Sequence, residues 1–144
     1  MIYRLLGELE IGDDPPLDLP GGHNLVVLAA LLINANQRIS KTELLNAAWG
    51  SEDVSEAQLH KSIAALRALL GQIGRREDLV TYARHGYEIR VPDDDDLDML
   101  AFKRRLAQAE QARSQLRADE EIDCLRRALG LWRGQHPLSN VPSN

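Results

Sequence analysis

Apolar residues recur at helical spacing in two neighbouring segments in the middle of the chain. In residues 44–50, leucine and alanine side chains fall on one face of a helix, and a tryptophan-glycine pair would end it. From Leu59 to Leu70, large apolar side chains follow one another at intervals of three or four positions. Such intervals place side chains on one face of an α-helix. The pattern therefore predicts two amphipathic helices, of which the second is the longer.

A serine that can cap a helix stands before each of these segments. Ser40 is followed three residues later by Glu43, and Ser55 is followed at the same distance by Gln58. A serine with Glu or Gln three positions on is the pattern of a capping box, which satisfies N–H groups at the start of a helix. We therefore expect the two helices to begin at these serines, with a short turn between them.

The next segment has the pattern of a β-hairpin. Residues 79–83 and 87–91 are short runs rich in β-branched and aromatic side chains, and Arg84, His85 and Gly86 lie between them. Helix, short turn, longer helix and hairpin is the order of a winged helix-turn-helix, in which the second helix enters a DNA major groove. The sequence predicts a recognition helix at about 55–70 and a wing around 84–86.

The start of the chain predicts a strand and a helix. Residues 3–11 alternate loosely and are rich in leucine and isoleucine, so we expect a strand, with a turn at 12–16 and a short return strand at 17–19. Residues 25–35 are almost continuously apolar, which indicates a buried helix. These elements complete a first domain at residues 1–92.

The pattern of apolar and polar residues changes after Pro92 and the acidic run at residues 93–96. Apolar side chains then recur at helical spacing in two stretches, with a break expected at Ala118 and Asp119. This predicts an antiparallel helical hairpin of the TPR-like kind in a second region, 93–144, with an irregular tail from about residue 134. The fold class is α+β: a winged helix-turn-helix with an N-terminal antiparallel sheet and a C-terminal hairpin wing, followed by an α-helical hairpin.

Composition changes this picture in one respect. The chain has 144 residues, of which 44% are hydrophobic, and its formal net charge is −5. DNA-binding domains are usually basic, so the charge argues mildly against a nucleic-acid partner, although a local basic patch can still meet phosphates. The chain lacks an apolar run long enough to span a membrane and a signal peptide, and Cys124 is its one cysteine. We expect a cytoplasmic, reduced protein with no membrane partner.

Motifs for catalysis are missing from the sequence. It has no nucleophile elbow, P-loop or dinucleotide-binding glycine pattern. The four histidines stand in unrelated predicted elements, and a single cysteine cannot supply a zinc-binding pair. We therefore expect that the protein is not an enzyme and has no catalytic, cofactor-binding or metal site.

Several segments of the chain match one recognisable combination. They are residues 5–11, 31–36, 44–50, 66–70, 86–87, 96–102 and 128–134, the last with a Leu-Trp-Arg-Gly sequence. Over its whole length the chain thereby resembles the Streptomyces antibiotic regulatory proteins, which place an OmpR/PhoB-type winged helix before a bacterial transcriptional activation domain. The resemblance implies a bacterial transcription regulator that binds double-stranded DNA, with RNA polymerase or a second copy of the chain as candidate partners. The second region would hold a truncated activation domain, consisting of its first helix pair.

Alanine dominates the outward face of the predicted recognition helix. Base readout needs long donors and acceptors, and only Lys61 and Gln58, with His60 as a weaker candidate, provide them. Alanine can touch a thymine methyl group and lets a helix sit deep in the groove, but it brings no charge. The residues opposite the apolar stripe are Ala57, Lys61, Ala64, Ala65 and Ala68.

The remaining candidate contacts are cations and two residues suggested by the resemblance. We assign Lys61, Arg67, Lys41 and Arg38 to phosphates, which position a protein on DNA without specifying its sequence. Arg84 at the wing tip could meet phosphate or enter a minor groove. Thr81 and Trp49 match family positions that approach the sugar-phosphate backbone, although a tryptophan in this place is more often a core residue than a contact.

A second interpretation of the same helix remains open. A small, nearly uncharged face is also what helix-helix packing prefers. The alternative function is therefore a winged helix with weakened DNA binding that acts as a protein-protein interaction module.

Overall fold

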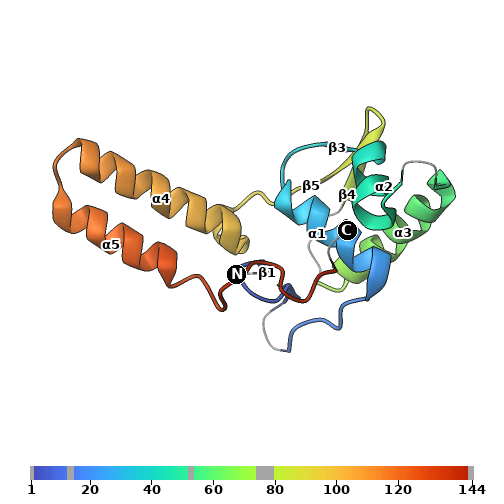
Figure 1. Cartoon of the computed structure of the whole chain (residues 1–144), viewed down its shortest axis with the longest axis horizontal. Coiled ribbons are helices and arrows are strands. Elements are labelled where there is room, and N and C mark those ends of the chain that lie inside the picture. Colours follow the sequence, from blue (N-terminus) through green and yellow to red (C-terminus); the bar gives the residue numbers. More distant parts are fainter. Residues whose placement is uncertain (1, 13–14, 52–53, 74–79, 143–144) are drawn as a thin grey trace. The chain divides into compact units, whose positions relative to one another are not determined.

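The computed structural model contains two compact units (Figure 1). The residues that it describes are 2–12, 15–51, 54–73 and 80–142. One unit consists of Asp18–Pro92 with Val141–Asn144, and the other of Met1–Leu17 with Asp93–Asn140. The first 17 residues thus group with the C-terminal helices, whereas the sequence-based division assigned them to the winged helix.

The unit around Asp18–Pro92 has the element order of a winged helix. Helices α2 and α3 are consecutive, and the sheet has the strand order β3-β5-β4 with antiparallel neighbours. The expected hairpin is present as β4 and β5, although Leu79 lies outside the described residues. The elements are α1 (Gly22–Ile33), β3 (Ile39–Ser40), α2 (Lys41–Trp49), α3 (Glu56–Gly71), β4 (Val80–Ala83) and β5 (Gly86–Ile89).

Burial of one face fixes the orientation of α3. Leu59, Ile63, Leu66 and Leu70 are at most 2% exposed, as the apolar spacing predicted. Burying four such side chains supplies most of the force that holds the helix against α1, since each is worth about 1.5–3 kcal/mol. The opposite face of α3 therefore points away from the core.

The predicted caps form, with one difference in detail. The Ser40 side chain accepts a hydrogen bond from the Glu43 N–H, and Gly50 ends α2 in the left-handed conformation, with φ at 72°. The Ser55 side chain accepts from the N–H of Ala57 rather than pairing with Gln58. Both helices therefore begin where the serines predicted. Two residues of the intervening turn, 52 and 53, lie outside the described part of the chain.

At the N-terminus the expectation of one long strand at residues 3–11 is wrong. The chain forms two short antiparallel strands, β1 (Tyr3–Arg4) and β2 (Glu10–Ile11), and residues 17–19 form no strand. Leu5 and Leu6 are both buried, which a straight strand with alternating side chains cannot achieve on one face. Gly7, with φ at 132°, permits the chain to turn back here.

The second unit contains the expected helical hairpin, α4 (Asp98–Ser114) and α5 (Ala118–Leu129), after a short 3-10 helix at Asp94–Asp96. The break expected at Ala118 and Asp119 lies earlier. Leu116 takes a positive φ of 58°, and the Arg117 N–H returns to the carbonyl of Ala112, which closes α4. Ala118 and Asp119 instead start α5, where carboxylates are favourable beside the positive end of the helix.

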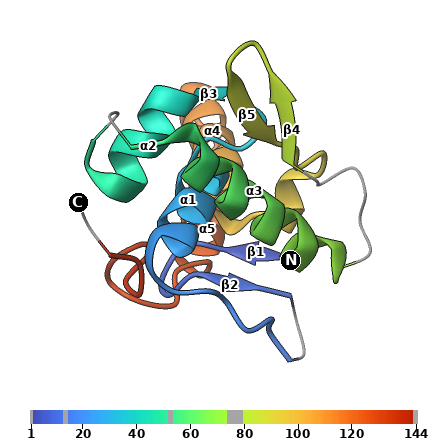
Figure 2. The ribbon, with the colours of Figure 1, turned by 90° about the vertical axis from the view of Figure 1, so that its right-hand side faces the viewer.

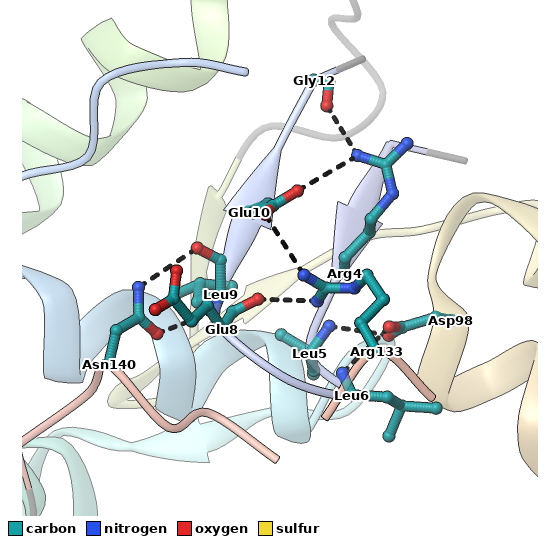
Figure 3. A network of polar contacts seen from close by, with 10 residues as sticks. All are labelled: Arg4, Leu5, Leu6, Glu8, Leu9, Glu10, Gly12, Asp98, Arg133 and Asn140. Atoms are coloured by element: carbon teal, nitrogen blue, oxygen red, sulfur yellow. Dashed lines mark hydrogen bonds and ion pairs between the residues drawn. The ribbon is translucent and has the colours of Figure 1, made fainter. Parts of the chain in front are cut away.

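The segment that follows α5 is irregular, as predicted, but it is hydrogen-bonded to the N-terminal hairpin. The N–H groups of Arg133, Leu138 and Ser139 donate to carbonyls of residues 5–7. The Asn140 side chain accepts from the Leu9 N–H at 2.7 Å, as Figure 3 shows. This tail therefore belongs to the packed part of its unit.

Within the residues that the structure describes, every helix is too short or too polar to cross a membrane.

Candidate nucleic-acid interface

The wing is a tight β-hairpin. Strands β4 and β5 pair in register from Val80 with Ile89 to Ala83 with Gly86, which leaves Arg84 and His85 as a two-residue turn. Both turn residues have positive φ, 50° and 61°, the conformation that matches the twist of the two strands. Figure 2 shows the hairpin extending beside α2 and α3. The turn presents the exposed side chains of Arg84 and His85 at its tip.

Gly86 allows β5 to lie against β3. A Cβ atom on Gly86 would lie 2.5 Å from the carbonyl oxygen of Ile39 and 3.0 Å from the Arg38 side chain. Real Cβ atoms do not approach a backbone oxygen so closely. The glycine of the Gly-Tyr pair is therefore required for the close approach of two backbones, and it holds the wing against β3 just below the wing tip.

Lys41, the first residue of α2, joins α2, α3 and the wing. Its backbone N–H donates to the His85 carbonyl at 3.0 Å, and its Nζ lies 3.3 Å from Oε2 of Glu56 in α3. The same Nζ lies 5.1 Å from the ring centre of Tyr82 in β4. A hydrogen bond with the Tyr82 side chain and the charge of Glu56 outweigh desolvation and raise the pKa of Lys41. The lysine is therefore fully charged at neutral pH.

Two arginines of the candidate set also hold the wing. Arg38 Nη1 donates to the Arg84 carbonyl at 3.0 Å, and Arg67 Nε donates to the Val80 carbonyl at 3.0 Å. Each guanidinium has five N–H donors, so these bonds leave further donors for a phosphate. Arg38 and Arg67 thus have a structural contact in addition to any role on DNA.

The other four candidates are more separate. Gln58 and Lys61 are exposed on α3, and Thr81 is exposed on β4. Trp49 is half-buried at the end of α2, where it stacks on His23 with ring centres 4.8 Å apart. Within the described residues, none of the four forms a side-chain hydrogen bond or ion pair with another candidate.

Three residues at this interface were not singled out from the sequence: His23, Glu56 and Tyr82. Each contacts a candidate that lies on another element, and Glu56 is 15 residues away from Lys41 along the chain. A contact between side chains of different elements leaves no periodic signal in the sequence. Only Glu56 carried a local cue, since a carboxylate is common in the first turn of a helix.

A groove runs along the C-terminal half of the outward face of α3. Its volume is about 350 Å³, and residues 18–20 form its other wall. On the helix side it is lined by Ala65, Ala68 and Leu69 of α3 and by Gln72, which caps the C-terminus of the helix. The alanine-rich face is therefore open near Lys61 and walled on one side further along the helix.

Two family descriptions match this chain in succession. Residues 21–89 match the C-terminal domain of transcriptional regulatory proteins, and residues 97–143 match the bacterial transcriptional activator domain. The first match covers the helices and wing just described, and the second covers α4, α5 and the tail. The order of the two is the one that the sequence motifs predicted.

Individual relatives agree with these matches. The regulatory protein AfsR of Streptomyces coelicolor is 33% identical over 118 residues, and that of Streptomyces griseus is 30% identical over the same length. Each alignment covers 81% of this chain and 11% of the relative. Mycobacterium tuberculosis EmbR, solved in complex with a low-affinity phosphopeptide, matches with a TM-score of 0.86 and 28% identity. That match covers 97% of this chain and 38% of EmbR.

The chain spans about a tenth of the length of the AfsR proteins that it matches. Both parts of the expected architecture are nevertheless present and in order. The chain therefore belongs to the Streptomyces antibiotic regulatory protein family of transcription regulators, with an OmpR/PhoB-type winged helix before a bacterial transcriptional activator domain.

Proposed function

We propose that the winged helix binds double-stranded DNA, with α3 in the major groove and the wing tip on the adjacent backbone or minor groove. The observation that carries this proposal is the orientation of α3. Its apolar stripe is at most 2% exposed, so Gln58 and Lys61 necessarily face outward. Exposed cations flank that face from the wing, with Arg84 at its tip and Arg38 beside it.

Most of the proposed contacts would go to phosphates and position the protein on DNA, and few would go to bases and read the DNA sequence. Lysine and arginine neutralise phosphates and release counterions, which supplies sequence-independent affinity. Gln58 is the one outward amide on α3 that can pair with adenine, and Lys61 can pair with guanine. With only these two residues available to contact bases, one winged helix would have little sequence specificity. We infer that selective binding needs a second copy of the chain or RNA polymerase at a neighbouring site.

The groove along α3 favours the alternative function, protein docking. Ala65 and Ala68 are exposed there beside Leu19 and Pro20, which provides a small apolar surface with the acidic Asp18 on its wall. A protein segment could occupy this groove, whereas a phosphate backbone would gain nothing from it. Lys61 and Arg84 distinguish the two functions, because DNA binding requires their charges and protein docking in the groove does not.

Lys61→Gln and Arg84→Gln are each expected to weaken binding to any DNA duplex and to flatten its salt dependence. Each lost phosphate contact removes about 0.9 from the slope of log affinity against log salt. The slope is measured by fluorescence anisotropy with labelled duplexes of random sequence. Arg90→Gln is the matched control, because Arg90 is exposed on the same unit but follows β5 at the end opposite the wing tip.

The result that contradicts DNA binding is equally clear. If wild type binds no duplex at low salt, or if both variants keep the wild-type slope, α3 is not a DNA-reading helix. The docking alternative would then be supported if the wild-type chain binds a protein partner and Ala68→Glu does not.

A further inference from the structure

Lys41 differs from the other cations at the proposed interface in having a carboxylate partner. Its Nζ lies 3.3 Å from Oε2 of Glu56. Arg38 and Arg67 donate to backbone carbonyls, which leaves their charges uncompensated. Within the described part of the chain, none of the four other candidate cations forms an ion pair. One cation is therefore neutralised before any DNA arrives.

The two side chains of the pair differ in their exposure to solvent, and therefore in how easily a phosphate could displace them. The Lys41 side chain is 17% exposed, whereas that of Glu56 is 59% exposed. The ammonium is held in place by its own helix start, which bonds to the wing turn, and by the ring of Tyr82. The Glu56 carboxylate, at the start of α3, is the more accessible member. A competing anion would replace the carboxylate and leave the lysine in position.

We propose that Glu56 is a built-in competitor of DNA: its carboxylate occupies Lys41 in the free protein, and a backbone phosphate must displace it before Lys41 contributes to binding. This inference rests on the proposed DNA-binding function. It makes Glu56 a residue that sets affinity and salt dependence, although it touches no base. A phosphate that approached without displacing Glu56 would meet a like charge beside the lysine.

The consequence for binding follows from counterion release. Only a net positive site displaces cations from the phosphate backbone, and the Lys41–Glu56 pair has no net charge. The native chain should therefore show a shallower salt dependence than its number of interface cations implies. Removing the negative charge of Glu56 should restore the missing contact.

Glu56→Gln tests this directly, because glutamine keeps the size and polarity of the side chain. We expect tighter binding to random duplex DNA and a slope steeper by about 0.9. Between about 50 and about 200 mM salt, that difference amounts to about 3.5-fold more loss of affinity than in wild type. Glu43→Gln is the matched control: Glu43 is exposed on the first turn of α2 and pairs with Ser40, not with a cation.

A double-mutant cycle separates competition at Lys41 from a general change of charge. In a Lys41→Met background the stem and the backbone hydrogen bond to His85 remain, but the ammonium is gone. Glu56→Gln should then produce no gain, because the two changes act on one contact. Circular dichroism spectra and thermal melts of all four proteins establish that each is folded.

Each outcome decides the matter. A gain in Glu56→Gln that disappears with Lys41→Met supports the competitor. If wild type binds DNA but Glu56→Gln binds no tighter, or gains equally without the lysine, the inference fails while DNA binding stands. If neither wild type nor Glu56→Gln binds DNA at low salt, both fail. Binding by Glu56→Gln alone would support the inference most strongly.

Discussion

Asp98→Ala is expected to destabilise its unit by about 3 kcal/mol, since each buried donor left without a partner costs about 1–3 kcal/mol. The Asp98 carboxylate is 1% exposed and accepts hydrogen bonds from the N–H groups of Leu5 and Leu6, at 2.7 and 2.9 Å. Figure 3 shows the carboxylate facing these two groups. Alanine would leave both donors in the interior unpaired.

The loss is measured by guanidinium unfolding in a Trp49→Phe background, where Trp132 is the one remaining tryptophan. Trp132 suits this purpose because its ring packs edge-on against Phe102, with centres 5.7 Å apart, in the same unit as Asp98. Asp98→Asn keeps one acceptor and should fall between alanine and the native residue. Unfolding midpoints that do not differ among the three proteins would show that the buried carboxylate is not needed.

Gly86→Ala is the second change with a large expected effect, about 2–3 kcal/mol of stability, as for other atoms forced into a packed interior. The new methyl would lie 2.5 Å from the Ile39 carbonyl oxygen, so β3 and β5 must separate. The Arg38 side chain lies against Gly86 and donates to the Arg84 carbonyl, so both arginines would shift. Because two phosphate contacts are at stake, DNA affinity should also fall about tenfold.

The control for Gly86→Ala is another glycine of the same unit. Gly71 ends α3, and a Cβ atom there meets no atom within 4 Å, so Gly71→Ala should be neutral or slightly stabilising. Both variants are compared by unfolding, followed through Trp49 in a Trp132→Phe background, and by anisotropy with labelled duplex. Equal stability and equal DNA affinity for the two variants would exclude a special role for Gly86.

The elements that sequence patterns predicted well are those fixed by local rules. Ser40, Gly50 and the stripe from Leu59 to Leu70 each act within one turn of helix, so spacing alone specifies them. Leu5 and Leu6 are the counterexample, because their neighbouring burial depends on segments more than 90 residues away. Alternation within residues 3–11 suggested one strand, and long-range packing required a hairpin instead.

The candidate site shows the same division. Residue type and helix phase were sufficient to place Lys61 and Gln58 outward. Whether a given lysine is available depends on its neighbours in space, and nothing in the spacing of Lys41 and Glu56 indicates their ion pair. The family resemblance included Asp98 without giving its purpose. The structure gives that purpose, because the Asp98 carboxylate accepts hydrogen bonds from the N–H groups of Leu5 and Leu6.

The bonds between the tail and the N-terminal hairpin also determine the order in which the protein can fold during synthesis. The Leu9 N–H donates to Asn140, 131 residues later in the chain, and the Leu5 N–H donates to Asp98, 93 residues later. The ribosome releases residues 18–92 in between, and this unit has its own core. The winged helix can therefore fold while Leu5 and Leu9 still lack these partners. Residues 3–11 therefore lack these partners until residues 98 and 140 have been synthesised, and their apolar side chains stay available for aggregation over that interval.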